Sequence, residues 1–338
     1  MKKLAATAGL IALIGLKVCL PCSSAQAETG LSAEDTLKTI VKLRSVIPKD
    51  AASAATLGTE REGNGVIIDD EGTILTIGYL IREAEAIEVI GPSGKPVGAK
   101  FVGYDYDSGF GLVRADKSLG AAPIKLGKSS VIKAGDQVLI AGYGGEDAAQ
   151  RATVISRREF AGYWEYLLEE AIYTAPAYTN FSGAALIDPK GQLVGIGSLY
   201  SQLSVPGLGL FGCNVFVPID LLKPILSDLK KTGKSMKARR PWLGVNAEES
   251  HNKVFITKVT PGGPAEKAGI KPGDIVLGVG GKEVQGLADL YRKVWAMGKA
   301  GIAVPLSVLQ GVKVRDITVR TIDRDQYFAP IPPEGVSL

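Results

Sequence analysis

Short apolar runs separated by turn residues fill most of the chain between residues 65 and 218. The runs GVIID, TILTIG, AIEVI and QVLIAGY are examples, and Gly, Pro or Asp lies between them. Strands this short and this closely spaced are typical of all-β barrels or sandwiches. The pattern therefore predicts a mainly β domain over this part of the chain.

Two local patterns sharpen this prediction. Asp188-Pro189-Lys190-Gly191 has the residues of a type I turn, which predicts a hairpin between 184–187 and 193–197. Residues 28–50 are predicted to form a short helix and a lead-in to the barrel. After the last strand, Asp220 is expected to cap a helix. The apolar residues at helical spacing are Leu221, Leu222, Ile225, Leu226 and Leu229.

A second pattern begins after Arg240. An alternating strand, DIVLGV, precedes a helix from about Leu287, and a hairpin that turns at Gln310-Gly311 follows. This indicates a compact α+β unit of roughly 85 residues, a normal size for a domain. The predicted boundaries are 1–27 for a signal peptide, 28–235 for the barrel domain, 236–325 for the α+β domain and 326–338 for a proline-rich flexible tail.

The first 27 residues have the layout of a secretory signal peptide. Lys2 and Lys3 precede an apolar run, and Ala25-Gln26-Ala27 fits an A-x-A cleavage site. The apolar run is shorter than the ~20 residues that a membrane span needs. Cys22 follows Leu20-Pro21, a poor match to a lipoprotein signal. We therefore expect a periplasmic or secreted protein with no membrane span in its mature chain.

Charge and cysteine content narrow the class of protein. Three lysines and no acids lie within the predicted signal, which leaves 36 basic and 35 acidic residues. This near-neutral balance gives no reason to expect a nucleic-acid partner. The basic cluster at 230–240 is interpreted as a solvated linker. Cys213 is the remaining thiol after cleavage, so no internal disulfide is expected.

Several stretches, taken in order, resemble the HtrA (Deg) envelope proteases. They are GNGVIIDDEGTILTIGYLI, VGYDYDSGFGLVRA and NFSGAALIDPKGQLVGIGS in the barrel region, and WLGV and PGGPAEKAGIKPGDIVLGVGGKEV after the linker. The resemblance covers roughly residues 60–322. It implies a trypsin-like double β-barrel followed by a smaller α+β PDZ domain.

The resemblance also locates the positions of a Ser-His-Asp triad, in which serine attacks, histidine moves the proton and aspartate orients the histidine. Ser182 stands at the nucleophile position, Tyr79 at the histidine position and Gly109 at the aspartate position. A phenol with a reference pKa of about 10 is a poor base, and glycine has no side chain to orient one. Asp107, two residues before Gly109, is an alternative acid.

The region that would stabilise an oxyanion differs as well. Where the family has G-N-S-G, this chain has Asn180, Phe181, Ser182 and Gly183. Glycine at the first position lets the backbone turn an amide inward, and asparagine adopts such dihedral angles less readily. This change and the missing base predict that the barrel is a vestigial protease.

Composition excludes the usual base altogether. The chain has one histidine, His251, and it lies in a polar stretch of the α+β unit, where a surface position is expected. Lys190 as an alternative base would sit on the predicted turn, and Cys213 is read as a core residue. One His and one Cys cannot form a typical zinc site. The glycines of GLGLFG precede a strand, so no nucleotide site is expected. We predict no cofactor and no metal.

Peptide binding remains. PDZ domains add a peptide as a strand and hold its terminal carboxylate with backbone amides. By resemblance, Trp242, Leu243, Gly244 and Val245 form the carboxylate loop. Leu290 and Val294 line the pocket for the last side chain or belong to the core of their helix, and the sequence leaves both readings open.

Three hypotheses follow. The first is a non-catalytic HtrA-like protein that binds peptides, protein C-termini or unfolded envelope proteins, with Tyr79 filling the space of the imidazole. The second is an active serine endopeptidase of envelope protein quality control that uses Ser182 with an atypical base. The third is a structural PDZ adaptor for one fixed partner. The sequence does not set the oligomeric state.

Overall fold

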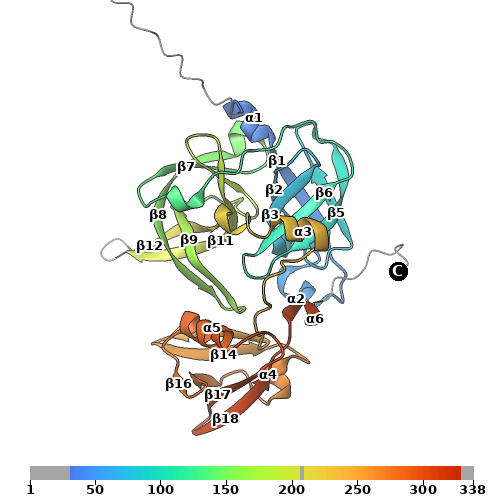
Figure 1. The fold of residues 1–338 in the computed structure, drawn as a ribbon. Coiled ribbons are helices and arrows are strands. Elements are labelled where there is room, and N and C mark those ends of the chain that lie inside the picture. Colours follow the sequence, from blue (N-terminus) through green and yellow to red (C-terminus); the bar gives the residue numbers. More distant parts are fainter. Residues whose placement is uncertain (1–30, 206–208, 329–338) are drawn as a thin grey trace, which may run out of the picture. The chain divides into compact units, whose positions relative to one another are not determined.

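A computed structural model of the chain describes residues 31–205 and 209–328 (Figure 1). The predicted signal peptide and residues 329–338 of the predicted tail lie outside the described residues.

The first barrel is a closed sheet of six antiparallel strands in the order β1-β2-β3-β6-β5-β4. Helix α1 (Ala33–Lys38) precedes it, as predicted. The predicted lead-in is in fact strand β1, which pairs with β2 and with β4 and so closes the barrel. The strands are β1 (Ile40–Val46), β2 (Glu60–Ile67), β3 (Thr73–Ile77), β4 (Ala86–Ile90), β5 (Pro96–Tyr104) and β6 (Phe110–Ala115), with helices α2 (Ala54–Leu57) and η1 (Gly78–Leu80) in the connections.

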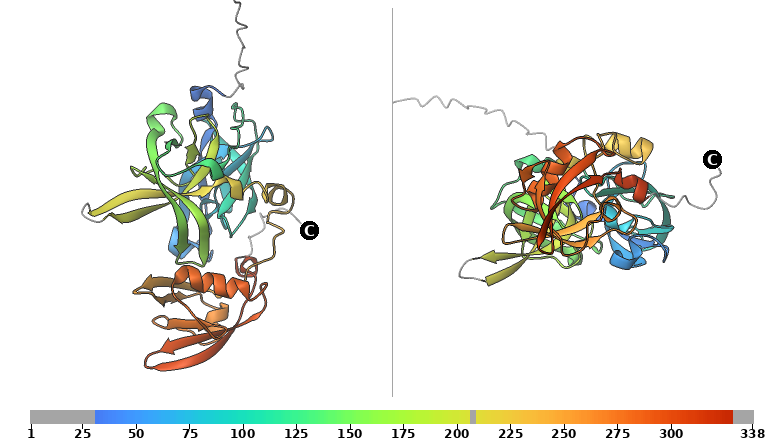
Figure 2. Two further views of the ribbon diagram at one scale, coloured as in Figure 1. Left: turned by 60° about the vertical axis from the view of Figure 1, so that its left-hand side comes forward. Right: turned by 90° about the horizontal axis from the view of Figure 1, so that it is seen from below.

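The second barrel is also closed, with the order β10-β11-β12-β9-β8-β7. The predicted type I turn is confirmed, because Gly191 N donates to Asp188 O at 3.0 Å between the paired strands β10 and β11. Strands β11 and β12 continue as a long hairpin (Figure 2). The elements are η2 (Ser129–Val131), β7 (Gln137–Ala141), η3 (Gly145–Ala148), β8 (Ala149–Gly162), β9 (Tyr166–Ala175), β10 (Ala185–Ile187), β11 (Leu193–Val205) and β12 (Gly209–Pro218).

The barrel core explains why these strands form. Alternate residues of the strands point inward and meet in one apolar cluster that contains residues of both barrels, and a further cluster fills the second barrel. In the described residues, closure gives each barrel strand a neighbour on both sides. Cys213 on β12 is fully buried in this core, with its thiol 3.4 Å from Ser201 O.

The segment after the second barrel differs from the prediction. Asp220 lies in the short helix η4 (Ile219–Leu221), and the longer helix α3 (Leu226–Thr232) begins only after Ile225. Pro224 has no N–H to donate and disfavours a helical residue before it, which separates the two. The Asp220 carboxylate accepts a hydrogen bond from Ser130 N at 2.8 Å and so ties the helix to the barrel.

The C-terminal unit is the predicted α+β domain. Its main sheet has the order β13-β14-β15-β17-β18, and β13 is therefore an edge strand. Helix α5 carries its apolar face into a separate cluster. The elements are β13 (Val245–Ser250), β14 (Lys253–Val259), α4 (Pro264–Lys267), β15 (Ile275–Val279), β16 (Lys282–Glu283), α5 (Leu287–Ala296), β17 (Ala303–Gln310) and β18 (Lys313–Arg320).

The first residues of the predicted tail, 326–328, belong to the described, ordered chain. Helix α6 (Arg324–Tyr327) continues the ordered chain, and the Tyr327 hydroxyl donates to Pro261 O at 2.8 Å. The guanidinium of Arg82 lies 3.9 Å from the ring centre of Phe328, so residues 326–328 are held by packing and cation–π contact. No helix in residues 31–205 or 209–328 is long and apolar enough to cross a membrane.

Candidate functional site

Each barrel contributes one hydroxyl to the candidate site. Tyr79 comes from η1, directly after β3, and Ser182 comes from the loop between β9 and β10. The Tyr79 hydroxyl lies 2.8 Å from Ser182 Oγ and 2.9 Å from Ser198 O. A carbonyl only accepts, and a phenol has one proton. The phenol proton therefore goes to Ser198 O, and the Ser182 hydroxyl can donate to the phenol oxygen.

The electrostatics of this pair oppose activation of the serine. Burial raises the pKa of Tyr79 to about 12, an effect that exceeds the opposing hydrogen bond from Ser182. The phenol is therefore neutral at physiological pH. A general base has to be unprotonated in order to take a proton. The two hydroxyls thus form a neutral hydrogen-bonded pair.

At Gly109, the expected aspartate position, an added side chain would be in tight contact with its neighbours. The φ of Gly109 is +80°, a conformation that favours glycine, and its carbonyl accepts from Gly78 N at 2.7 Å. A Cβ atom there would lie 3.2 Å from the Tyr166 hydroxyl. That hydroxyl donates to Ser108 O at 2.6 Å. A phenol from the second barrel thus occupies the space next to this position.

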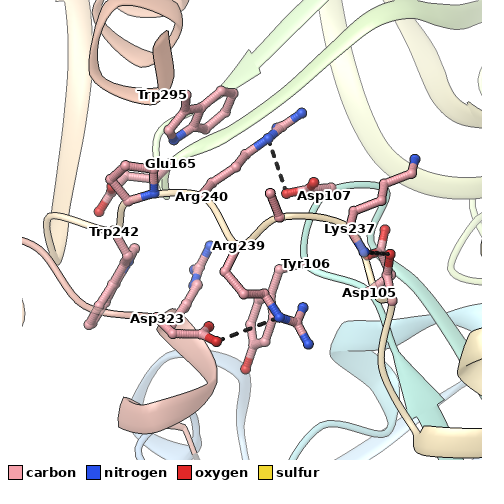
Figure 3. A pocket seen from close by; sticks show the side chains of 14 residues that line it. Asp105, Tyr106, Asp107, Glu165, Lys237, Arg239, Arg240, Trp242, Trp295 and Asp323 are labelled. Atoms are coloured by element: carbon pink, nitrogen blue, oxygen red, sulfur yellow. Dashed lines mark hydrogen bonds and ion pairs between the residues drawn. The ribbon is translucent and has the colours of Figure 1, made fainter. Parts of the chain in front are cut away.

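The two acids of the same loop have other partners. The Asp105 carboxylate accepts from Ser108 N at 2.9 Å and from Ser108 Oγ at 2.6 Å, which shapes the turn. Asp107 Oδ1 lies 3.3 Å from Arg240 Nε of the linker (Figure 3). Burial raises the pKa of Asp107, and Arg240 opposes this. Asp107, the alternative acid, is therefore paired with the linker.

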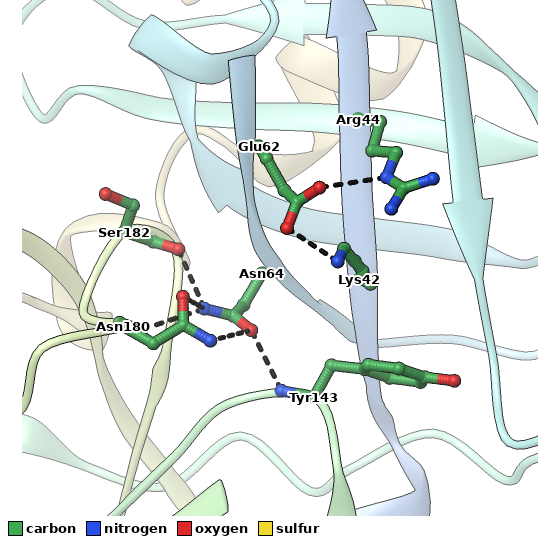
Figure 4. A network of polar contacts seen from close by, with 7 residues as sticks. All are labelled: Lys42, Arg44, Glu62, Asn64, Tyr143, Asn180 and Ser182. Atoms are coloured by element: carbon green, nitrogen blue, oxygen red, sulfur yellow. Dashed lines mark hydrogen bonds and ion pairs between the residues drawn. The ribbon is translucent and has the colours of Figure 1, made fainter.

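The turn that carries Ser182 is held by Asn64, a residue that the sequence interpretation missed. Asn64 Nδ2 donates to Asn180 O at 2.9 Å and to Ser182 O at 3.1 Å, and its Oδ1 accepts from Tyr143 N at 2.8 Å (Figure 4). Asn64 is 1% exposed. A buried amide inside the run GNGVII was the available signal, since buried polar groups require partners.

The residues around Ser182 form a tightly packed turn. Gly183 has φ +72°, and a Cβ there would lie 1.9 Å from Asn64 O. Asn180 is not among the left-handed non-glycine residues, which in the described ranges are Glu83, Glu165, His251 and Asn252. Its carbonyl instead points to Asn64. Phe181 O accepts from Ala184 N at 3.0 Å. The turn that carries Ser182 is therefore a well-defined, tightly packed structure.

The alternative bases and ligands lie elsewhere. Lys190 is exposed on its turn, as expected. His251 is exposed between β13 and β14, where its Nδ1 lies 3.0 Å from Ser250 Oγ. Residues 31–205 and 209–328 contain no cluster of three or more side chains suited to hold a metal ion.

The predicted carboxylate loop does gather backbone amides around one anion. The N–H groups of Leu243, Gly244 and Val245 donate to the carboxylate of Glu165, a residue of the second barrel. Gly244 has φ +81°, which lets its amide face the same point. We call these three N–H groups the carboxylate cradle. Glu165 was not foreseen from the sequence.

Other predicted residues of this region pack in the core. Trp242 is 4% exposed, and its ring centre lies 5.1 Å from that of Tyr327. Leu290 and Val294 on α5 are 0% and 1% exposed and belong to the apolar cluster of this domain. The same cluster contains Leu243 and Val245. In this structure Leu290 and Val294 are therefore core residues of their domain.

Comparisons with known proteins also divide the chain into a trypsin-like region and a PDZ region. Residues 63–196 match the trypsin-like peptidase domain family, and residues 241–321 match the PDZ domain family. The chain is 30% identical over 293 residues to a probable periplasmic serine endoprotease DegP-like of Pseudomonas fluorescens, covering 81% of this chain and 59% of that protein. It is 27% identical over 263 residues to the periplasmic serine endoprotease DegP of Escherichia coli, covering 74% and 55%.

This chain therefore spans somewhat more than half of the length of these relatives. Their periplasmic location agrees with the expected periplasmic or secreted location of this protein.

Solved structures show the same fold. The HtrA-type protease AlgW with decapeptide has a TM-score of 0.52 at 21% identity, covering 87% of this chain and 99% of that one. The serine endoprotease from Yersinia pestis has a TM-score of 0.51 at 23% identity, covering 88% and 100%. The predicted fold class, a trypsin-like double barrel followed by a PDZ domain, is confirmed.

Proposed function

Because the chain belongs to the HtrA-type family, with trypsin-like barrels and a C-terminal PDZ domain, we propose that it is a peptide-binding protein of the envelope whose barrel does not hydrolyse peptide bonds. Its ligands are protein C-termini and unfolded segments of envelope proteins, bound through the PDZ domain and beside Ser182. The relatives are named as endoproteases, so this chain would retain their binding surfaces without their chemistry.

The observation that supports the loss of chemistry is the hydrogen bond between Tyr79 and Ser182. A hydroxyl 2.8 Å from Ser182 Oγ, with its pKa raised to about 12, takes the place where a base is needed. Removal of the histidine from such a triad lowers turnover on the order of a millionfold. The glycine at position 109 adds to this, since no carboxylate orients a base there.

The binding half of the proposal is supported by the carboxylate cradle. Three backbone N–H groups between 2.8 and 3.1 Å from one carboxylate are the arrangement that captures a peptide C-terminus. A solved relative of the same fold was obtained with a decapeptide.

The test combines a probe of chemistry with a probe of binding. The purified protein and its Ser182→Ala variant are incubated with a serine-directed fluorophosphonate and, separately, with a chemically unfolded protein. We expect equal background labelling of both, no cleavage, and equal suppression of light scattering from the unfolded protein. Labelling or cleavage that disappears in Ser182→Ala would establish the active endopeptidase instead.

A library of C-terminal peptides addresses the third hypothesis. A general peptide binder should accept a set of related C-termini, whereas an adaptor for one fixed partner should accept a single sequence. The fluorophosphonate result does not depend on this outcome, so the two halves of the proposal can fail separately.

A further inference from the structure

The tip of the hairpin between β8 and β9 reaches the carboxylate cradle. Glu165 Oε2 accepts from Leu243 N at 2.9 Å, and Glu165 Oε1 accepts from Gly244 N at 2.8 Å and from Val245 N at 3.1 Å. Glu165 is only 6% exposed. Its carboxylate has the same chemistry as a peptide C-terminus and uses the amides that would bind one.

The residue two positions before Glu165 binds as a peptide main chain would. Ala247 N, on the edge strand β13, donates to Tyr163 O at 2.8 Å. Edge strands offer unpaired N–H and C=O groups, and PDZ ligands pair with such an edge. The hairpin tip therefore contacts both the cradle and the strand that an external peptide would extend.

An apolar residue of the same hairpin packs into the PDZ domain. Leu167, at the start of β9, is 5% exposed and belongs to the apolar cluster of the PDZ domain rather than to that of the barrels. Leu290 and Val294 are members of the same cluster. A leucine of the hairpin thus shares its apolar cluster with the two residues expected to receive the last side chain of a peptide.

Helix α5 also contacts the hairpin between β8 and β9. The Tyr291 hydroxyl donates to Gly162 O at 2.8 Å and accepts from Glu165 N at 3.1 Å. Arg292 pairs with the carboxylates of Glu159 and Glu169, one on each strand of the hairpin. Charged and polar contacts from α5 therefore complement those of the cradle.

Glu165 is the last residue of the three-residue turn that joins β8 and β9. Glu165 has φ +57°, and a left-handed non-glycine residue costs on the order of 1–3 kcal/mol. Burial raises the pKa of Glu165, an effect that the three backbone N–H groups oppose. The same three N–H groups would stabilise the carboxylate of an external peptide in its place.

We propose that the β8–β9 hairpin is an internal ligand of the PDZ groove, and that an external C-terminus binds only after Glu165 has left the carboxylate cradle. This inference rests on the proposed peptide binding and adds its regulation. Occupancy by the hairpin reduces the apparent affinity for a peptide by the fraction of molecules whose groove is open.

The test uses Glu165→Gly, which removes the carboxylate and suits the left-handed backbone. Glu88→Gln, at an exposed glutamate on β4, is the matched control. Fluorescence polarisation is measured with a library of labelled peptides that end in a free carboxylate and with the same peptides amidated. We expect Glu165→Gly to bind free-acid peptides about tenfold or more tightly than the wild type and Glu88→Gln. Amidated peptides should show no such gain.

Hydrogen exchange separates failure of the inference from failure of peptide binding. In the wild type, the amides of Leu243, Gly244 and Val245 should be protected by Glu165, and they should exchange faster in Glu165→Gly. Equal exchange in both proteins would overturn the internal ligand, whatever the peptides do. Protection with no peptide bound by either protein would refute the proposed function. Equal peptide affinity in both would refute the regulation alone.

Discussion

The turn that carries Ser182, here called the serine turn, and the carboxylate cradle are both expected to act on peptides. The function of the first depends on side chains, and that of the second depends on backbone N–H groups. Catalysis by a serine triad needs three particular side chains, and at the positions expected for its histidine and aspartate this protein has Tyr79 and Gly109. The cradle needs three backbone N–H groups and a glycine with φ +81°, and all are present. A site made of backbone tolerates side-chain change, whereas a site made of side chains does not.

The turn that carries Ser182 keeps a defined structure whatever its chemistry. Asn64 and Gly183 hold the serine turn in a fixed conformation, and the buried Asn64 is fully engaged there. The serine turn therefore contributes to the stability of the fold. Its packing and its chemistry can be separated by mutation.

The largest expected loss of stability follows substitution of Gly183. In Gly183→Ala the new Cβ would lie 1.9 Å from the carbonyl oxygen of Asn64, at a φ of +72°. We expect the free energy of unfolding to fall by more than about 3 kcal/mol, because a backbone atom must move. Urea unfolding measures this.

Gly191→Ala is its control. The φ of Gly191 is similar, +74°, and its Cβ would lie 3.5 Å from Thr36 Oγ1, an ordinary contact. It should lose about 1 kcal/mol from backbone strain alone. Equal losses in the two variants would show that the serine turn has room and is not a packed structural element.

A smaller loss of stability is expected when histidine and aspartate are introduced at the two expected triad positions. Tyr79→His with Gly109→Asp should give no detectable peptide hydrolysis, because the Tyr166 hydroxyl lies 3.2 Å from the new Cβ and position 109 has φ +80°. Gly109→Asp alone should lower the free energy of unfolding by about 2 kcal/mol. Cleavage of an unfolded protein and urea unfolding are the two measurements.

Tyr166→Phe provides the control for that steric argument. In the Gly109→Asp background, removing the hydroxyl should recover about 1 kcal/mol relative to the sum of the single losses. Strict additivity, or full proteolytic activity in the rebuilt triad, would contradict the role assigned to Tyr166.

The smallest effect concerns alkaline pH. The pKa of Tyr79 is raised to about 12 in the folded protein, against 10.0 for the free side chain. Its contribution to stability is therefore complete below pH 10 and is lost as the pH rises through about 12. Tyr79→Phe lacks this loss, so its stability relative to the wild type should rise by at most about 2 kcal/mol between pH 9 and pH 12.

Urea unfolding at each pH tests this prediction. The remaining buried tyrosines are common to both proteins, so the difference isolates Tyr79. A constant difference across this range would mean that the phenol ionises as easily in the folded protein as in the unfolded one.

The fold could be read from the sequence because its signals are local. Short apolar runs, the Asp188–Gly191 turn and the alternation in the second domain each specify an element without reference to distant residues. The start of helix α3 was misplaced because Pro224 was not weighed against the apolar periodicity. Strand β1 was missed because its alternation follows directly on a helix.

The candidate site was predictable only in part. Tyr79, Gly109 and Ser182 were located by their neighbours in sequence, and the contact between the two hydroxyls follows from that placement. Asn64 and Glu165 act across 116 and 78 residues, and no local pattern encodes such contacts. Domain boundaries at 235 and 325 stay predictions, although the ordered chain continues past 325 into Phe328.

The rate at which the buried Cys213 thiol is labelled reports how often the second barrel opens. Cys213 is the one cysteine in residues 31–205 and 209–328, and it is fully enclosed between strands of the second barrel. A thiol reagent can reach it only when those strands separate, so its labelling rate reports the opening of the barrel core. Release of the hairpin tip alone should leave that rate unchanged, and collapse of the fold should raise it.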